Sequence, residues 1–232
     1  MKRLAIFVEG QTEQLFVTKL LREIAGENCI TINNEKYVNK NGMRLITSID
    51  AASVENERKF YVIIRDCGGD SCVKSDIIDG CEKLSMAGYE KIIGLLDVYP
   101  KTRNEIQKYE LGLKYGVPTK YIPINIVLAV MEIEAWFLGE ASHFNKIHPD
   151  LTRERIVSTF GFDPFTENME IRNHPADDLN DIYKLVGFAY NKKKQNTLRT
   201  VNSLDYNRLY IEQQEKMESL ENLIAQIDSF LT

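Results

Sequence analysis

The chain has 232 residues, of which 44% are hydrophobic and 27% charged, and its formal net charge is −5. This is the composition of an ordinary globular protein, and the acidic balance argues against a general nucleic-acid coat protein. No apolar run approaches the length of a membrane span, and the run after Met1 is too short for a signal peptide. The four cysteines form no Cys-x-x-Cys pair, so we expect reduced thiols rather than a zinc site. We therefore expect a cytoplasmic protein.

The first predicted element is a short buried strand over residues 4–8, which leads directly into Glu9. Gly10 allows the tight turn that follows, and Thr12 can cap the helix that begins there. Apolar residues then recur at helical spacing. Glu9 therefore ends a strand, and Glu13 enters the first helical turn at the same edge of a sheet.

Two further buried strands repeat this pattern, and each ends in an aspartate. One covers residues 59–66 and ends in Asp66, before a Gly-rich turn, and the other covers residues 92–97 and ends in Asp97. Strands that alternate with helices predict an α/β fold, with a mostly parallel sheet and helices on both faces. Ligands bind beyond the carboxyl ends of such strands, where Glu9 and both aspartates lie.

The remaining elements divide the chain near residue 140, because no convincing strand follows that point. We predict an α/β domain over residues 1–140 and an all-helical extension over residues 141–232. Further strands are predicted over residues 29–32, 43–49 and 122–130, and helices over residues 73–86, 103–115, 150–160, 175–190 and 211–231. The last helix carries an apolar stripe that packs on the protein's own core or contacts a second copy in a homodimer: Met217, Leu220, Ile224, Ile227 and Leu231.

The acids at the strand ends indicate a metal site. Carboxylates gathered at one edge raise each other's pKa unless a cation binds among them. Oxygen ligands suit Mg²⁺, so we predict that Glu9, Glu13, Asp66 and Asp97 hold Mg²⁺ or Mn²⁺. Taken singly, each aspartate could instead accept hydrogen bonds from the backbone of its own turn.

A further ligand is predicted from the segment Glu132-Ile133-Glu134-Ala135-Trp136. Residues two apart on a helix face different ways, so at most one of the two glutamates would reach the cluster. We choose Glu134 because its neighbours at helical spacing are apolar. The alternative is that this acid pairs with a lysine or an arginine.

A phosphate backbone needs cations near the site. Tyr190 could stack on a base beside the basic stretch that follows it. The alternative for the basic stretch is a solvated loop. The alternative for Lys101 and Arg103 is that they simply offset the charge of the acids. The predicted nucleic-acid-binding residues are Lys101, Arg103, Lys192, Lys193, Lys194 and Arg199.

The string Val8-Glu9-Gly10-Gln11-Thr12-Glu13 resembles the first motif of the Toprim domain, which topoisomerases, primases, recombination-mediator proteins and overcoming-lysogenisation-defect nucleases share. Leu95-Leu96-Asp97-Val98-Tyr99 stands where that family carries Asp-x-Asp, with Tyr99 in place of the second aspartate. The segment at Glu132, with Pro175, Leu185 and Tyr190-Asn191-Lys192, is similar to a bacterial Toprim-like family of uncharacterised function. Those proteins are often partners of ATPases in phage-defence systems. The resemblance covers residues 1–205.

The resemblance implies a Toprim-like fold and a metal-dependent endonuclease that hydrolyses DNA or RNA. In the family, the glutamate that matches Glu9 is a general acid/base or a metal ligand, and Asp97 would hold Mg²⁺. It also implies a role as a phage-defence effector, with an ATPase partner encoded nearby.

Two other functions also fit the sequence. The missing second aspartate and the apolar stripe of the last helix fit a non-catalytic module that binds a partner ATPase. A phosphatase that acts on small nucleotides is the third function.

Overall fold

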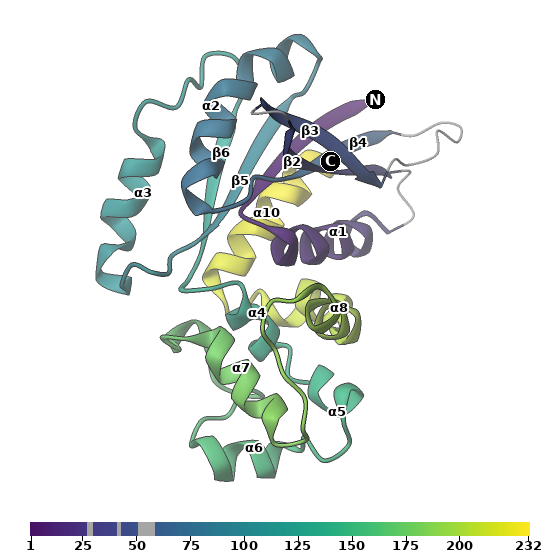
Figure 1. The fold of residues 1–232 in the computed structure, drawn as a ribbon, viewed down its shortest axis with the longest axis vertical. Helices are drawn as coiled ribbons and strands as arrows, with labels where there is room; N and C mark the ends of the chain where they lie inside the picture. The colour runs from purple at the N-terminus through teal and green to yellow at the C-terminus, as the bar shows by residue number, and fades with distance from the viewer. Residues whose placement is uncertain (27–29, 41–42, 51–58) are drawn as a thin grey trace. The chain divides into compact units, whose positions relative to one another are not determined.

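A computed structural model describes residues 1–26, 30–40, 43–50 and 59–232. The chain divides into two compact units (Figure 1). The first unit contains residues 1–97, 104–128 and 225–232, and the second contains residues 98–103 and 129–224. The second unit thus begins before the predicted boundary at residue 140, and the chain end returns to the first unit. Residue 29 of the predicted strand 29–32 lies outside the described residues.

The first unit is built on a sheet whose strands are β1 (Lys2–Val8), β2 (Ile30–Lys40), β3 (Met43–Asp50), β4 (Phe60–Asp66), β5 (Lys91–Asp97) and β6 (Ile124–Ala129). Within the described residues the sheet is six-stranded, in the order β3-β2-β4-β1-β5-β6. The pairs β2–β4, β4–β1 and β1–β5 are parallel, and β3 runs antiparallel to β2. The predicted α/β fold with a mostly parallel sheet is therefore confirmed.

Strand β1 lies at the centre because residues Leu4 to Val8 are apolar and buried on both faces. Its register pairs Val8 with Asp66 of β4 and with Leu95 of β5. The three strands therefore end at one edge of the sheet, and the residues that follow them are brought to that edge.

Helices cover both faces of this sheet (Figure 1): α1 (Gln11–Ala25), α2 (Asp70–Met86) and α3 (Ile106–Lys114), which follows a 3-10 turn (Arg103–Glu105). Helix α2 packs against β1 and β5, and its Val73 and Ile77 share one core cluster with Ala5 and Phe7 of β1. Helix α1 packs against β2 and β4. None of the described helices is long and apolar enough to cross a membrane.

The last helix, α10 (Glu218–Leu231), begins in the second unit and ends in the first. Its Phe230 packs edge-on against Phe60 of β4, with ring centroids 5.5 Å apart. The residues of its predicted apolar stripe that are buried within the chain are Met217, Leu220, Ile224 and Ile227. This burial favours the interpretation that the stripe packs on the protein's own core.

The second unit consists of short helices: α4 (Glu134–Gly139), α5 (His143–Ile147), α6 (Arg153–Phe160), a 3-10 turn η2 (Met169–Ile171), α7 (Pro175–Lys184), α8 (Lys194–Ser203), α9 (Tyr206–Arg208) and a π-helical turn η3 (Leu209–Gln213). The predicted helix 175–190 ends early because Gly187 takes a left-handed φ of 77°. The predicted single helix 211–231 is wrong. The helix is interrupted between η3 and α10. A new helix, α10, begins at Glu218 and has Glu218 and Glu221 in its first turn, where acids are stabilising.

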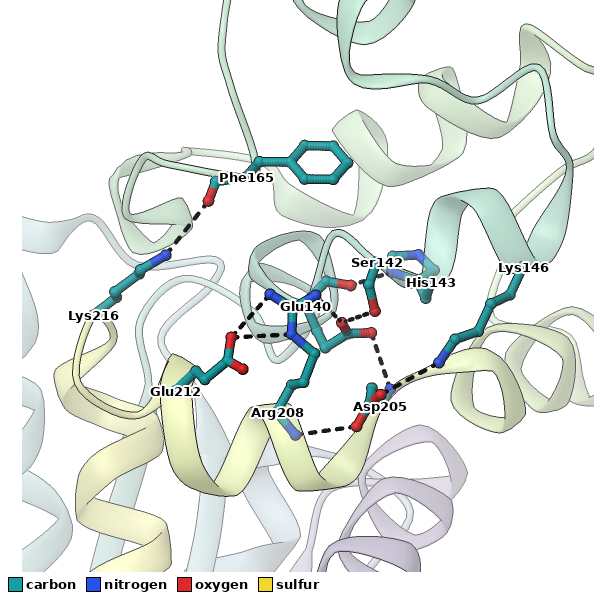
Figure 2. A network of polar contacts seen from close by, with 9 residues as sticks. All are labelled: Glu140, Ser142, His143, Lys146, Phe165, Asp205, Arg208, Glu212 and Lys216. Carbon is teal, nitrogen blue, oxygen red and sulfur yellow. Dashed lines mark hydrogen bonds and ion pairs between the residues drawn. The ribbon is translucent and has the colours of Figure 1, made fainter.

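A buried carboxylate joins several of these helices (Figure 2). Glu140, at the end of α4, is fully buried. It accepts hydrogen bonds from the Ser142 hydroxyl and from the Asp205 amide at 3.0 Å, and Arg208 Nη1 lies 3.8 Å from its Oε1. Burial raises the pKa of Glu140, although these hydrogen bonds and the nearby cations act in the opposite direction. The network therefore retains a carboxyl group whose ionisation is costly.

His143 extends this network into the core of the second unit. Its Nδ1 lies 2.7 Å from the Glu140 carbonyl oxygen, and its Nε2 lies 2.9 Å from the Tyr183 hydroxyl. Burial lowers the pKa of His143 to about 4, so the ring is neutral at pH 7. A carbonyl oxygen only accepts, so the single proton of the ring sits on Nδ1, and Nε2 accepts from Tyr183.

The raised pKa of Glu140 makes stability depend on pH. The folded carboxyl group holds its proton to a higher pH than the unfolded one, so its contribution is present below the ordinary pKa of glutamate and is lost as pH rises through the folded value. We expect the stability of Glu140→Gln relative to the parent protein to increase with pH over this window and then level off. Urea unfolding between pH 4 and pH 8, roughly the range around ordinary carboxyl values, measures it. A difference that stays constant or falls with pH would contradict this explanation.

Candidate functional site

Glu9 and Asp97 meet at the edge where β1 and β5 end. Glu9 Oε1 accepts a hydrogen bond from the Asp97 backbone amide, with a distance of 2.8 Å. The Glu9 carbonyl oxygen accepts from the Gly69 amide, also at 2.8 Å, in the turn between β4 and α2. Asp97 itself is buried, and Glu9 is half-buried. The side chain of Glu9 is thus fixed by one neighbouring strand end and its backbone by another.

Glu13 lies at the same edge but has a local partner. Its Oε2 accepts a hydrogen bond from the Gly10 amide at 2.9 Å, which closes the first turn of α1. Gly10 has no side chain that could cap the helix, so the carboxylate of Glu13 organises this end of α1. The structure places Glu13 next to the strand end and gives it a capping role.

Asp66 ends β4, as predicted, but its surroundings differ from those of Asp97. Its Oδ1 accepts a hydrogen bond from the Gly68 amide at 2.9 Å. Burial raises the pKa of Asp66, while the Gly68 bond and the charge of Lys36, its neighbour across β2 and β4, lower it. Asp66 therefore sits beside a lysine and organises its own turn.

Two residues that the sequence did not single out join the Glu9–Asp97 pair. Burial and, to a smaller extent, the negative charges of Glu9, Asp70 and Asp97 together raise the pKa of Tyr109, on α3, to about 12. The Tyr109 hydroxyl thus lies within electrostatic reach of three carboxylates. Asp70 is the first residue of α2, where an acid is favourable. We call Glu9, Asp70, Asp97 and Tyr109 the acidic edge.

The donor set at the acidic edge suits one kind of metal site. Within the described ranges, no group of three or more His, Cys, Asp or Glu side chains is arranged to hold a metal ion. This geometry does not fit a closed cage made by protein ligands alone. Mg²⁺ is commonly held by one or two carboxylates, with waters and substrate phosphates completing its shell. The pair of Glu9 and Asp97 fits that open arrangement.

The second unit contains a different carboxylate constellation around Lys192. The Lys192 ammonium lies 3.5 Å from Glu132 Oε1 and 3.4 Å from Glu134 Oε1. Fully buried Glu134 accepts from the Tyr190 hydroxyl at 2.6 Å, and Glu132 Oε2 accepts from the Ala176 amide in the first turn of α7. We call Glu132, Glu134, Tyr190 and Lys192 the lysine cluster. It matches the alternative in which Glu134 pairs with a basic residue.

Both glutamates reach the same lysine, although we predicted that helical spacing would separate them. Glu132 precedes α4, which begins only at Glu134, so helical geometry does not apply to the pair. The backbone before it turns sharply, since Met131 has a left-handed φ of 62°. Lys192 is also left-handed, with φ of 56°. Such conformations are costly for residues other than glycine and are often found at functional sites.

Several of the predicted nucleic-acid-binding residues hold the protein together. Arg103 donates hydrogen bonds to the carbonyl oxygens of Glu170 and Arg172, which fixes the turn η2. Arg199 donates to the Ala189 carbonyl oxygen at 2.6 Å and lies over the Phe188 ring. Lys101 is half-buried, whereas Lys193 and Lys194 are exposed at the start of α8. The alternative of a solvated loop is wrong for residues 194–203, which form helix α8.

The proposed stacking of Tyr190 on a base is also wrong. Only 3% of Tyr190 is exposed, and its hydroxyl donates a hydrogen bond to Glu134. A ring that is buried in the protein core cannot present a face to a nucleotide. Tyr190 instead positions a buried carboxylate.

Residues 8–198 match the family model described as a domain of unknown function, DUF4276. The chain belongs to the DUF4276 family. The part that matches this family begins just before Glu9 and includes both the acidic edge and the lysine cluster, and it ends within α8. No curated protein and no solved structure matches the chain.

We predict that removing the charge of Lys192 from the lysine cluster destabilises this DUF4276 protein. Lys192→Met removes the ammonium group that lies 3.4 Å from Oε1 of buried Glu134, so we expect the free energy of unfolding to fall by about 1–3 kcal/mol. This is less than for a fully buried pair because the Lys192 side chain is 45% exposed. Urea denaturation at neutral pH measures the change.

Lys193→Met is the matched control, because it removes the same charge from the next, exposed position. Its effect should stay within about 0.5 kcal/mol, as is usual for surface substitutions. Equal effects of the two substitutions would mean that Lys192 does not stabilise the buried carboxylates.

Proposed function

We propose that this DUF4276 protein is an endonuclease that hydrolyses phosphodiester bonds in DNA or RNA with Mg²⁺ or Mn²⁺. The observation that carries the proposal is the contact between Glu9 Oε1 and the Asp97 amide at the carboxyl edge of a parallel sheet. Sites of α/β proteins lie at this edge. The resemblance of the Glu9 and Asp97 motifs to Toprim nucleases supports the choice of reaction.

In this proposal the carboxylates of Glu9 and Asp97 would hold the ion. When bound, the ion would neutralise the scissile phosphate and stabilise the leaving oxygen. Glu9 would take a proton from the attacking water at its carboxylate, and its fixed orientation would lower the cost of reaching the reactive geometry. Tyr109 stays protonated at neutral pH, since its pKa is about 12, and so offers an O–H donor among acceptors.

The proposed enzyme would also contact nucleic acid and a partner protein. Lys193 and Lys194 are the exposed cations that would contact a phosphate backbone. The resemblance to phage-defence proteins supports a cytoplasmic effector with an ATPase partner.

A specific observation favours the non-catalytic alternative. Of the acids that we expected to hold metal, Glu13 caps α1, Asp66 lies beside Lys36 and Glu134 pairs with Lys192. Tyr99 also stands where a second aspartate would be. A module that only binds a partner would keep such a fold without a complete metal site.

Cleavage assays test the proposal. Plasmid, single-stranded DNA and tRNA are incubated with the protein in Mg²⁺ or Mn²⁺, and we expect cleavage that a chelator abolishes. Glu9→Gln keeps the size and an acceptor oxygen but loses the charge, so we expect a loss of at least about 100-fold in rate.

Glu23→Gln is the control, since it makes the same change at an exposed position of α1 and should cleave normally. Undiminished cleavage by Glu9→Gln would reject the mechanism. A lack of cleavage of every substrate would favour the non-catalytic module.

A further inference from the structure

A cavity of about 630 Å³ opens in the first unit beside α2, on the side of the β2–β3 hairpin. Its wall combines residues of four elements, among them Tyr37 of β2, Ile46 of β3, Arg65 of β4 and Gly80 of α2. Pockets for small molecules usually have volumes of this order and combine apolar walls with a few placed polar groups. None of its lining residues belongs to the acidic edge or the lysine cluster.

Arg65 supplies a fixed cationic donor in the cavity wall. Its side chain is only 8% exposed, and its Nε and Nη2 both donate to Glu35 Oε2, at 3.0 and 2.7 Å. The guanidinium lies over the Phe7 ring at 5.1 Å and over the Tyr37 ring at 5.7 Å. The remaining guanidinium nitrogen of Arg65, Nη1, lies near α2, since a Cβ added at Gly80 would lie 3.9 Å from it. The donor is therefore held in place before any ligand arrives.

Asp76 places an acceptor in the same wall. It is 2% exposed, which is rare for an aspartate. Burial raises the pKa of Tyr37, and the charges of Arg65 and Asp76 then act on it in opposite directions, Arg65 lowering and Asp76 raising it. Both charges thus lie near the Tyr37 hydroxyl. A donor, an acceptor and an aromatic ring meet in this part of the cavity.

The part of the lining that strand β3 supplies is apolar and exposed. Leu45 and Ile46 of strand β3 are 42% and 48% exposed, although both are large and apolar. Leu84 of α2 and Ala87, which follows this helix, also line the cavity. Exposed apolar side chains that border a cavity are available for contact with an apolar ligand surface.

Gly80 keeps the cavity open. It lies in the interior of α2, where glycine destabilises a helix relative to alanine. Packing does not require glycine here, because the nearest atoms to an added Cβ lie at 3.7 to 3.9 Å, an ordinary contact. A larger side chain at this position would extend into the cavity instead.

We propose that this cavity binds a planar heteroaromatic ring of the nucleobase class. Its flat face would pack on Tyr37 and on the apolar wall of β3, as bases do on aromatic side chains. Its edge, which carries a hydrogen-bond donor beside an acceptor, would match Asp76 and Arg65. The base belongs either to a free nucleoside or nucleotide or to an unpaired base of a nucleic acid.

Isothermal titration calorimetry of the full chain with adenosine, guanosine, cytidine and uridine tests this inference, with ribose as a probe that lacks the base. A chelator is present, so that the outcome is independent of any cleavage. We expect at least one nucleoside to bind with Kd below about 1 mM, the weak end of specific binding, and ribose not to bind. A lack of binding by all four nucleosides, or equal binding of ribose, would overturn the proposal.

Gly80→Leu fills the cavity with a good helix-forming residue and should weaken nucleoside binding by at least about tenfold. Gly80→Ala is the matched control and should bind within about threefold of the parent protein, because its methyl group is accommodated. If Gly80→Leu does not fold, Ile46→Ser at the exposed wall must weaken binding instead. Unchanged affinity in the folded variant would contradict the assignment.

Competition separates the two sources of the base. A single-stranded oligonucleotide that displaces the nucleoside assigns the cavity to a base of a nucleic acid, whereas an oligonucleotide that does not compete assigns it to a free nucleoside or nucleotide. An abasic oligonucleotide of the same length should not compete in either case. Competition by the abasic strand would show that phosphates, rather than the base, are recognised, and would overturn the proposal.

Discussion

The acidic edge depends on the hydrogen bond from the Asp97 amide to the Glu9 carboxylate. It joins the ends of β1 and β5 through a side chain, while the bond from Gly69 to the Glu9 carbonyl joins the turn after β4 through the backbone. A backbone amide that donates to a carboxylate favours its ionised form. The edge can therefore keep acids close to one another, which is what an open metal site requires.

The sequence predicted that Glu9 and Asp97 lie at this edge, because a buried apolar strand and the acid that ends it are adjacent in the sequence. Apolar runs and a parallel arrangement of the strands are enough to bring Glu9 and Asp97 together. These runs lie in residues 4–8, 60–66 and 91–97. For Asp66 the structure matches the alternative in which the aspartate accepts from its own turn, through the Gly68 amide. The bond from the Gly10 amide to Glu13 was not predicted. Tyr109 carried no signal, because an isolated tyrosine on a helix gives no indication of which charges will face it.

The second unit was harder to predict for a different reason. Glu134 pairs with Lys192, which is distant in sequence. Lys192 itself has a left-handed backbone conformation. Neither periodicity nor spacing indicates such a pairing. The same unit buries Glu140 and His143, whose partners also come from separate helices. Buried polar groups of this kind restrict the arrangement of helices, because each is stable only when all its partners are in place.

The most direct test of the account is Mn²⁺ binding, measured by electron paramagnetic resonance, in three variants that each remove one predicted acid. The account predicts that Asp97→Asn weakens Mn²⁺ binding by at least about tenfold, whereas Asp66→Asn and Glu134→Gln bind as the parent protein does. Undiminished binding in Asp97→Asn, or equal losses in all three variants, would contradict a site built on Glu9 and Asp97.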